Sequence, residues 1–310
     1  MACVGWYNDS PGKFTECPPN PALNRGGAKR AHLIAKSKKF QFIGKPALAM
    51  FHQERLLIPG VPIRLKFTRA AAKFCLLGGT THVDGGEDIE PDFKVLITNA
   101  VFLFRKVKVN DTVHARLLKE LELSNALYPI TRAEIRAMSL SQGDMAFEHL
   151  LLNNAQPKKI LICFVTTESF NGSYNTNPLE FITADLNYLA ITQDNNSTIL
   201  GRPLQPNFAE KLHMKEYHNL FTGTGTSMTD LMFDLRYDDI TGGYCFFAFN
   251  SQPQLQDAGY VNLQKGGPLR IEMKFAEPLD EPLMCLAYCE FDECIEITRS
   301  KSVIYDKKLV

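Results

Sequence analysis

The sequence predicts an all-β protein built from packed antiparallel sheets, and its last quarter carries the clearest evidence. In residues 269–275 four apolar residues alternate with three charged ones, which is the period-two pattern of a half-buried strand. Residues 283–289 are apolar throughout, as in a strand in the middle of a packed sheet. Turn signals separate such runs by roughly 8–12 residues. Short strands of this kind must bury one face against a second sheet.

Further strands are predicted around these two runs. Residues 243–250 form a run too short and too rich in Phe for a helix. Pro278 and Pro282 bracket a turn, because proline fixes φ and cannot donate a hydrogen bond to a sheet. The last two strands are predicted at residues 295–297 and 303–305.

Residues 1–39 are predicted to be an irregular arm, because turn-forming Gly and Pro sequences follow one another there. Between residues 25 and 39 the arm carries six basic residues and no acid. A solvated arm explains this stretch better than a nucleic-acid site, so nucleic acid is expected at most as a non-specific partner. The basic residues are Arg25, Lys29, Arg30, Lys36, Lys38 and Lys39.

The β pattern begins at residue 40, and residues 40–310 are predicted to form one β domain. The early strands are predicted at residues 40–51, 63–67, 73–77 and 93–109. Residues 63–67 alternate cleanly between apolar and basic side chains. The acidic loop at residues 78–92 lacks the ligand order of a calcium loop, so a solvated loop is the simpler interpretation.

Two helices are predicted in loops between the strands. The first covers residues 111–125: Asn110 or Asp111 can cap it, and apolar residues recur every four positions from Val113. Later strands are predicted at residues 130–140, 159–167 and 181–192.

The second helix is predicted at residues 207–221. Asn207 can cap it, and Glu210 follows three residues later, as in a capping box. The helix is expected to end near Gly223.

Composition excludes a chain that is basic overall, because Lys plus Arg equals Asp plus Glu at 34 each. The charge is uneven, however. Residues 1–50 hold eight basic and two acidic residues, whereas residues 225–310 hold eight basic and fourteen acidic ones. Oppositely charged ends suit contacts between copies as well as within one copy. Two solvated surfaces are the simpler explanation.

Cysteines and hydropathy indicate the compartment. Most of the eight cysteines lie inside apolar runs, where Cys behaves as a small hydrophobic residue. No charged and then apolar leader opens the sequence, and it has no apolar run of 18 residues. We therefore expect a protein of a reducing compartment, in the cytoplasm or nucleus, that is neither secreted nor inserted in a membrane.

The residues that could carry chemistry do not form a catalytic constellation. His213 and His218 are five residues apart, so they do not make the i,i+4 pair of zinc hydrolases. Cys285 and Cys289 share a strand face but lie about 13 Å apart along it. Cys294 is expected on a neighbouring run, so packing thiols are expected instead of a zinc cluster. We predict no catalytic residue, no cofactor-binding residue and no metal ligand.

The glycine-rich run at residues 221–226 is similar to a phosphate-binding loop only in composition. It follows a helix instead of a strand, and no Gly-Lys-Ser/Thr occurs in it. We therefore predict that the protein is not an enzyme and needs no metal or nucleotide.

Several short motifs stand out in the sequence: Asn24-Arg25-Gly26, residues 51–61, Phe170-Asn171-Gly172-Ser173, Leu204-Gln205-Pro206-Asn207, residues 221–225 and residues 243–250. Together they resemble a capsid-like protein carried by Maverick/Polinton elements, which are virus-like DNA transposons of animal genomes. The end of the chain also resembles the C-terminal barrel of double jelly-roll major capsid proteins of DNA viruses. Gly259-Tyr260-Val261-Asn262-Leu263 stands where those proteins have a Gly-x-x-Asn-Leu loop.

This resemblance implies a jelly-roll β-sandwich with the two helices in inter-strand loops, and a structural capsid function. It also implies self-assembly with other capsid proteins, as trimers with two barrels per chain, within a virion. Only about 40 residues precede the β pattern, so residues 1–39 are either an arm or the remnant of a preceding barrel. We therefore expect a truncated copy or a fragment.

Two rival functions suit the same fold class. A carbohydrate- or ligand-binding jelly roll would need a concave aromatic or acidic pocket. A metal-dependent cupin-type enzyme would need two His close together on a strand with an acid, and the spacing of the histidines argues against it.

Overall fold

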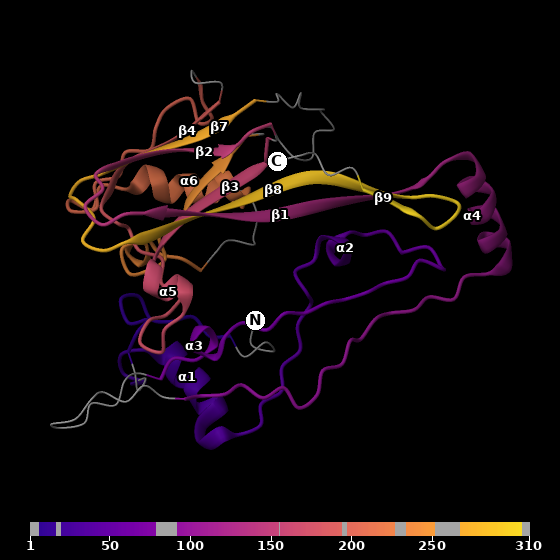
Figure 1. The fold of residues 1–310 in the computed structure, drawn as a ribbon, viewed down its shortest axis with the longest axis horizontal. Coiled ribbons are helices and arrows are strands. Elements are labelled where there is room, and N and C mark those ends of the chain that lie inside the picture. The colour runs from indigo at the N-terminus through magenta and orange to yellow at the C-terminus, as the bar shows by residue number, and fades with distance from the viewer. Residues whose placement is uncertain are drawn as a thin grey trace.

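The computed structural model describes residues 6–16, 20–78, 92–154, 156–193, 197–226, 234–251 and 267–305. Its strands form two antiparallel sheets, one above the other in Figure 1. The strand order is β1-β8-β3-β6 in one sheet and β2-β7-β4-β5 in the other, and β9 pairs with β8. The pairs β1/β8, β2/β7, β3/β6 and β4/β5 thus alternate between the sheets, which is the wrapping of a jelly roll. The prediction of an all-β jelly-roll sandwich is confirmed.

All described strands lie after residue 125. They are β1 (Ala126–Leu140), β2 (Ala146–Leu152), β3 (Lys159–Thr166), β4 (Leu186–Gln193), β5 (Ser197–Thr198), β6 (Phe247–Asn250), β7 (Leu269–Phe275), β8 (Leu283–Ile297) and β9 (Val303–Tyr305). The strands predicted in the last quarter lie on β6, β7, β8 and β9, and β8 runs through the break expected before residue 295.

The main core fills the space between the sheets, and β7 shows how the sequence pattern produces it. Its apolar residues Leu269, Ile271 and Met273 are completely buried, while the charged residues between them face outward. Phe164 of β3 packs edge-on against Phe275 of β7, with ring centroids 6.2 Å apart, and so joins the two sheets. The period-two pattern therefore places this strand correctly.

The helix predicted at residues 111–125 is present as α4 (Asp111–Leu123). The side chain of Asn110 accepts a hydrogen bond from the backbone N–H of Thr112 and caps the helix. Leu121 is buried in a second, smaller cluster, together with Ile58, Tyr128 and Ile297. This cluster lies at the end of the long β1–β8 pair, away from the main core (Figure 1).

The helix predicted at residues 207–221 begins later than expected, because α6 covers Met214–Thr224. Asn207 does accept a hydrogen bond from the Glu210 N–H, as an N-cap would. The chain then turns back, however, and the backbone groups of Asn207 and Leu212 bond to each other. Lys211 takes a positive φ of 56°, which stops a helix from running through this turn.

Short helices lie elsewhere in the chain. They are α1 (Arg25–Ile34), α2 (Ala49–His52), α3 (Ala72–Cys75) and α5 (Thr167–Asn171), with 3₁₀ turns at Ala35–Ser37 and Tyr237–Asp239. The segment 1–39, predicted to be irregular, therefore contains α1. The division of the chain into an arm up to residue 39 and a domain from residue 40 stays a prediction.

The strands predicted at residues 40–51, 63–67, 73–77 and 93–109 are wrong. The described part of this region, residues 40–78 and 92–110, contains only α2 and α3, and we call it the N-terminal extension. Figure 1 shows it below β1 and β8 as long stretches without regular structure. A period-two pattern favours an extended chain, but a strand also needs a hydrogen-bonded neighbour. The described residues supply none to the extension.

Candidate functional site

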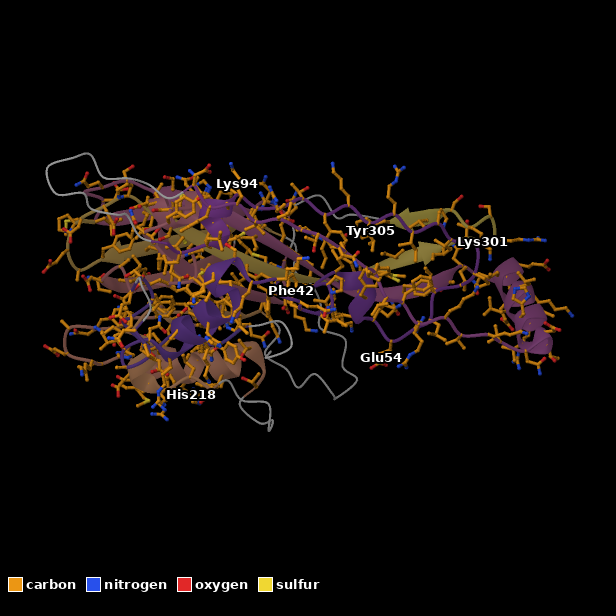
Figure 2. All side chains as sticks on the ribbon, turned by 90° about the horizontal axis from the view of Figure 1, so that it is seen from below. Phe42, Glu54, Lys94, His218, Lys301 and Tyr305 are labelled. Carbon is orange, nitrogen blue, oxygen red and sulfur yellow. The ribbon has the colours of Figure 1, made fainter. Side chains whose placement is uncertain are left out.

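The two histidines considered from the sequence lie in different surroundings. His213 is buried and its ring stacks on Tyr237, with centroids 4.1 Å apart. His218 is exposed on α6, and Figure 2 shows its side chain at the margin of the molecule. The structure therefore does not bring them together.

The cysteines considered from the sequence also stay apart. Cys285 and Cys289 are completely buried in the main core, whereas Cys294 is exposed. Among the described residues no three His, Cys, Asp or Glu side chains are arranged to hold a metal ion. Burial raises the pKa of the Cys163 and Cys289 thiols to about 12, so both are protonated at neutral pH.

This burial predicts two classes of thiol. Cys75 and Cys294 are exposed and should react rapidly with a thiol reagent such as DTNB. Cys163, Cys285 and Cys289, together with Cys245, should react only after unfolding in urea. Alkylation followed by mass spectrometry of the native and the unfolded protein measures this site by site. Equal rates for both classes in the native protein would contradict the described core.

The glycine-rich run at residues 221–226 ends α6. Thr224 donates a hydrogen bond from its hydroxyl to the Leu220 carbonyl, and Gly225 caps the helix with a positive φ of 77°. The C-terminal end of a helix carries the negative end of the helix dipole, which disfavours an anion, so the run is suited to helix termination and not to phosphate binding. The acidic residues from Asp84 to Glu90 lie outside the described residues.

A buried polar network fixes the start of the chain to the sandwich, and it centres on Asp9. The Asp9 side chain accepts hydrogen bonds from Asn24 at 2.8 Å and from Asn177 at 3.2 Å, and it forms an ion pair with Arg30 at 2.5 Å. The Tyr244 hydroxyl donates to the Asp9 backbone carbonyl at 2.8 Å. Residues from four distant parts of the sequence thus meet around one buried carboxylate.

Close backbone approaches complete this joint and account for the Asn24-Arg25-Gly26 motif. A Cβ atom on Gly26 would lie 1.9 Å from the carbonyl oxygen of Asn8, so no larger residue fits there. Phe14 packs against Tyr244, with ring centroids 4.9 Å apart, and a Cβ on Gly243 would collide with the Phe14 ring. Only the glycines and the motif itself signalled this network in the sequence.

The N-terminal extension has an unusual surface, which is both apolar and basic. It carries ten Lys and Arg residues but only two acids, Glu54 and Asp92. Figure 2 looks onto this side of the molecule, with Phe42 near its middle. Large apolar side chains that are more than half exposed are Phe42, Ile43, Leu56, Ile63, Phe67, Leu96, Ile97, Val101, Leu103 and Phe104. Such a surface is typical of a region that contacts another molecule or another part of the assembled protein.

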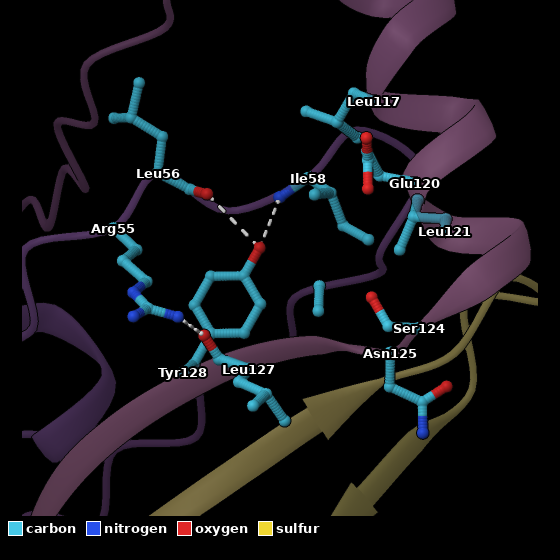
Figure 3. A pocket seen from close by; sticks show the side chains of 11 residues that line it. Arg55, Leu56, Ile58, Leu117, Glu120, Leu121, Ser124, Asn125, Leu127 and Tyr128 are labelled. Atoms are coloured by element: carbon cyan, nitrogen blue, oxygen red, sulfur yellow. Dashed lines mark hydrogen bonds between the residues drawn. The ribbon is translucent and has the colours of Figure 1, made fainter.

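A small pocket of about 380 Å³ lies between α4, the start of β1 and residues 55–58 of the extension (Figure 3). The Tyr128 hydroxyl lies at its centre, accepting a hydrogen bond from the Ile58 N–H at 3.1 Å and donating one to the Leu56 carbonyl at 3.2 Å. Arg55 bonds to the Leu127 carbonyl at 2.6 Å. The hydrogen-bonding groups of Tyr128 are therefore used inside the protein, which favours a structural joint over a ligand site.

In the described ranges no helix is both long and apolar enough to cross a membrane.

Comparison of the sequence with known proteins gives one distant relative. No protein-family model matches the chain. An uncharacterized protein of Caenorhabditis elegans is 23% identical over 267 residues, which cover 84% of this chain and 61% of that protein. The chain thus spans about three fifths of the length of this relative.

Comparison of the structure finds weak matches to viral capsid proteins. The mavirus major capsid protein gives a TM-score of 0.34 at 11% identity, over 60% of this chain and 42% of the other. The Sputnik virophage structure gives 0.37 at 11% identity, over 60% and 40%, and the PBCV-1 capsid gives 0.33 at 9% identity, over 59% and 52%. At such low TM-scores the fold assignment depends on the strand order of the chain itself.

Proposed function

We propose that this chain is a capsid-type structural protein of a virus-like DNA transposon or a DNA virus, and that it assembles with copies of itself. The observation that carries the proposal is a jelly roll joined to an extension with an exposed apolar surface. Jelly rolls host many functions, so the fold alone does not decide. Monomeric proteins rarely leave such a surface in water, and an assembling protein covers it.

The motifs that resemble Maverick/Polinton capsid proteins support the proposal, because one of them joins the extension to the jelly roll. Gly172, after α5, has a positive φ of 88°, and a Cβ there would lie 3.1 Å from the backbone of Phe74 in α3. The Gly78 N–H donates to the Tyr174 carbonyl, and Phe93 packs edge-on against the Tyr174 ring. The motif, together with Tyr174 directly after it, therefore lies where the extension contacts the jelly roll.

The partners follow from the same proposal. Copies of this chain and other capsid proteins are the expected partners, with trimers forming when a first-barrel segment covers the extension. Five of the six basic residues in 25–39 are exposed, whereas Arg30 is used in the ion pair with Asp9. Nucleic acid is therefore expected only as a non-specific contact, and the assembled protein is expected in a virion.

The exposed extension predicts weak and heterogeneous association of the isolated chain. Light scattering coupled to size-exclusion chromatography, over a range of concentrations, should show a broad distribution of oligomers. Replacing Val101, Leu103 and Phe104 together with Ser should shift this distribution strongly toward the smallest species, the monomer and the dimer, because each residue is at least 70% exposed. The matched control is Leu212→Ser with Met214→Ser, at exposed positions on the sandwich.

Three results would contradict the proposal. If the triple substitution and its control had equal effects on association, the extension would not be part of the assembly surface. A stable, discrete trimer of the chain alone would mean that no first-barrel segment is needed. A clean monomer at every concentration would count against a capsid protein and favour the ligand-binding alternative.

A further inference from the structure

The long strand β1 leaves one edge of its sheet open. It pairs with β8 over all 15 residues, from Ala126 opposite Ile297 to Leu140 opposite Leu283, and the register has no bulge. No other described strand pairs with β1. An edge of this length presents a row of free N–H and C=O groups, which is a template for another strand.

At the two ends of this edge the backbone groups are not available to another strand. These ends also show which residues turn their backbone N–H and C=O groups away from β8. The carbonyl of Leu127 accepts a hydrogen bond from Arg55 instead of a strand. Pro129 has no N–H, and a proline in a sheet normally turns its nitrogen to the open edge. Beyond the strand, the Ser141 N–H donates to the Asp144 carboxylate.

Backbone groups alternate between the two sides of a strand, so Leu127 and Pro129 place the odd-numbered residues on the open edge. Within the described ranges, no residue forms a hydrogen bond to the open-edge backbone between Thr131 and Ser139. Ile135 is the central residue of this stretch. Two copies can therefore align along its whole length when they pair antiparallel about Ile135.

The side chains along this stretch also suit contact with a copy. On the outer face every one is uncharged and exposed, and Ile135 is 64% exposed. The members of this face are Thr131, Ala133, Ile135, Ala137 and Ser139. Free edges are often guarded by outward charged side chains such as Lys, and this outer face has none; Pro129 and the charges on the inner face are the guards that this edge does have.

The inner face of β1 next to the edge is charged. Around Ile135 its charges are arranged so that opposite charges would face each other when two copies pair. Glu134 forms ion pairs with Arg132 at 2.5 Å and with Arg136 at 2.8 Å. In an antiparallel pair of β1 strands centred on Ile135, Glu134 of each copy lies opposite Arg136 of the other. Opposite charges facing each other across strands are favourable, whereas like charges are not.

We propose that two copies of this chain pair antiparallel through the open edges of β1, about a two-fold axis at Ile135. The pair joins the two β1 sheets into one continuous sheet. Residues 131 to 139 of each copy then exchange about ten backbone hydrogen bonds with the other copy. An interface of this kind is self-complementary, as a two-fold axis requires. The inference does not depend on a capsid function.

Sedimentation velocity tests the pairing in the variant that carries Ser at positions 101, 103 and 104. In this variant the extension contributes least to association between copies. This protein should form a concentration-dependent dimer. Adding Ile135→Lys places two like charges at the axis, and it should weaken the dimer at least tenfold. Leu212→Lys is the matched control, since Leu212 is 62% exposed and lies off the edge. Circular dichroism checks that each variant folds.

Cross-linking tests the register independently. With Cys3, Cys17, Cys75 and Cys294 changed to Ser, Ile135→Cys should form a disulfide-linked dimer under mild oxidation, because the two Ile135 positions meet at the axis. Thr131→Cys should not, because its two copies lie roughly 27 Å apart in this register. The pairing would be overturned if Ile135→Lys left the dimer affinity unchanged. Equal cross-linking of Ile135→Cys and Thr131→Cys would overturn it as well. The variant with Ser at positions 101, 103 and 104 would also overturn the pairing if it stayed monomeric at all concentrations. That result would leave the effect of the extension on association intact.

Discussion

Met273→Asp should destabilise the protein by about 3–5 kcal/mol, because it places a carboxylate without a partner in the main core. Met273 is completely buried on β7, opposite Phe147 of β2 and Leu189 of β4. No described basic side chain lies on this inner face of β7. Urea unfolding followed by fluorescence measures the loss as a change in the free energy of unfolding.

The matched substitution on the neighbouring residue is Glu272→Lys, which should change stability by less than about 1 kcal/mol. Glu272 lies on the outer face, next to Lys274 and opposite Glu148 of β2. A lysine there meets Glu148 favourably and Lys274 unfavourably, so the two effects offset each other. Similar losses from both substitutions would mean that the register of β7 is wrong.

Asp9→Ala should release the start of the chain from the sandwich and cost about 2–4 kcal/mol, because buried donors of Asn24 and Asn177 lose their acceptor. Arg30 also loses its ion partner, although it is partly exposed. Limited proteolysis should then cut residues 6–30 much faster than in the parent protein. Asp92→Ala is the control, since its ion pair with Lys94 is fully on the surface and should matter little.

Asp9→Ala should also lower the pKa of the Tyr244 hydroxyl. Burial and then the nearby Asp9 charge raise the pKa of Tyr244 to about 12, so this pKa should fall when Asp9 is removed. A tyrosine pKa that is higher in the folded state contributes stability below its ordinary value near 10, and that stability is lost as pH rises toward 12. Absorbance at 295 nm follows the tyrosines. An unchanged Tyr244 titration would show that Asp9 is not beside it.

Sequence patterns predicted the elements whose signal is local. The alternation in β7 and the cap before α4 each lie within a few residues, so the strand and the helix were placed correctly. The predicted start of the second helix, at residue 207, was wrong because the side chain of Asn207 caps a turn instead of the helix. The strands expected in the extension were wrong because alternation does not reveal whether a pairing partner exists.

The buried joint around Asp9 could not be predicted in the same way. Asn177 is 168 residues from Asp9 and Tyr244 is 235 residues away, so no local pattern connects them. A lone Asp near turn-forming residues also looks like a surface residue. The sequence analysis used the motif with Gly26 only for a family resemblance, and the close backbone approach at Gly26 is seen first in the structure.

The β1–β8 pairing has a consequence for how the chain reaches its fold. The ion pair between Arg132 and Glu293 joins residues 161 positions apart, and folds rich in such distant contacts form slowly. At a synthesis rate of about 5–20 residues per second, β8 emerges roughly 8–30 s after β1. During this interval both edges of β1 are open. We expect the alternating charges of Arg132, Glu134 and Arg136 to favour hydration of the nascent strand until its partner is made.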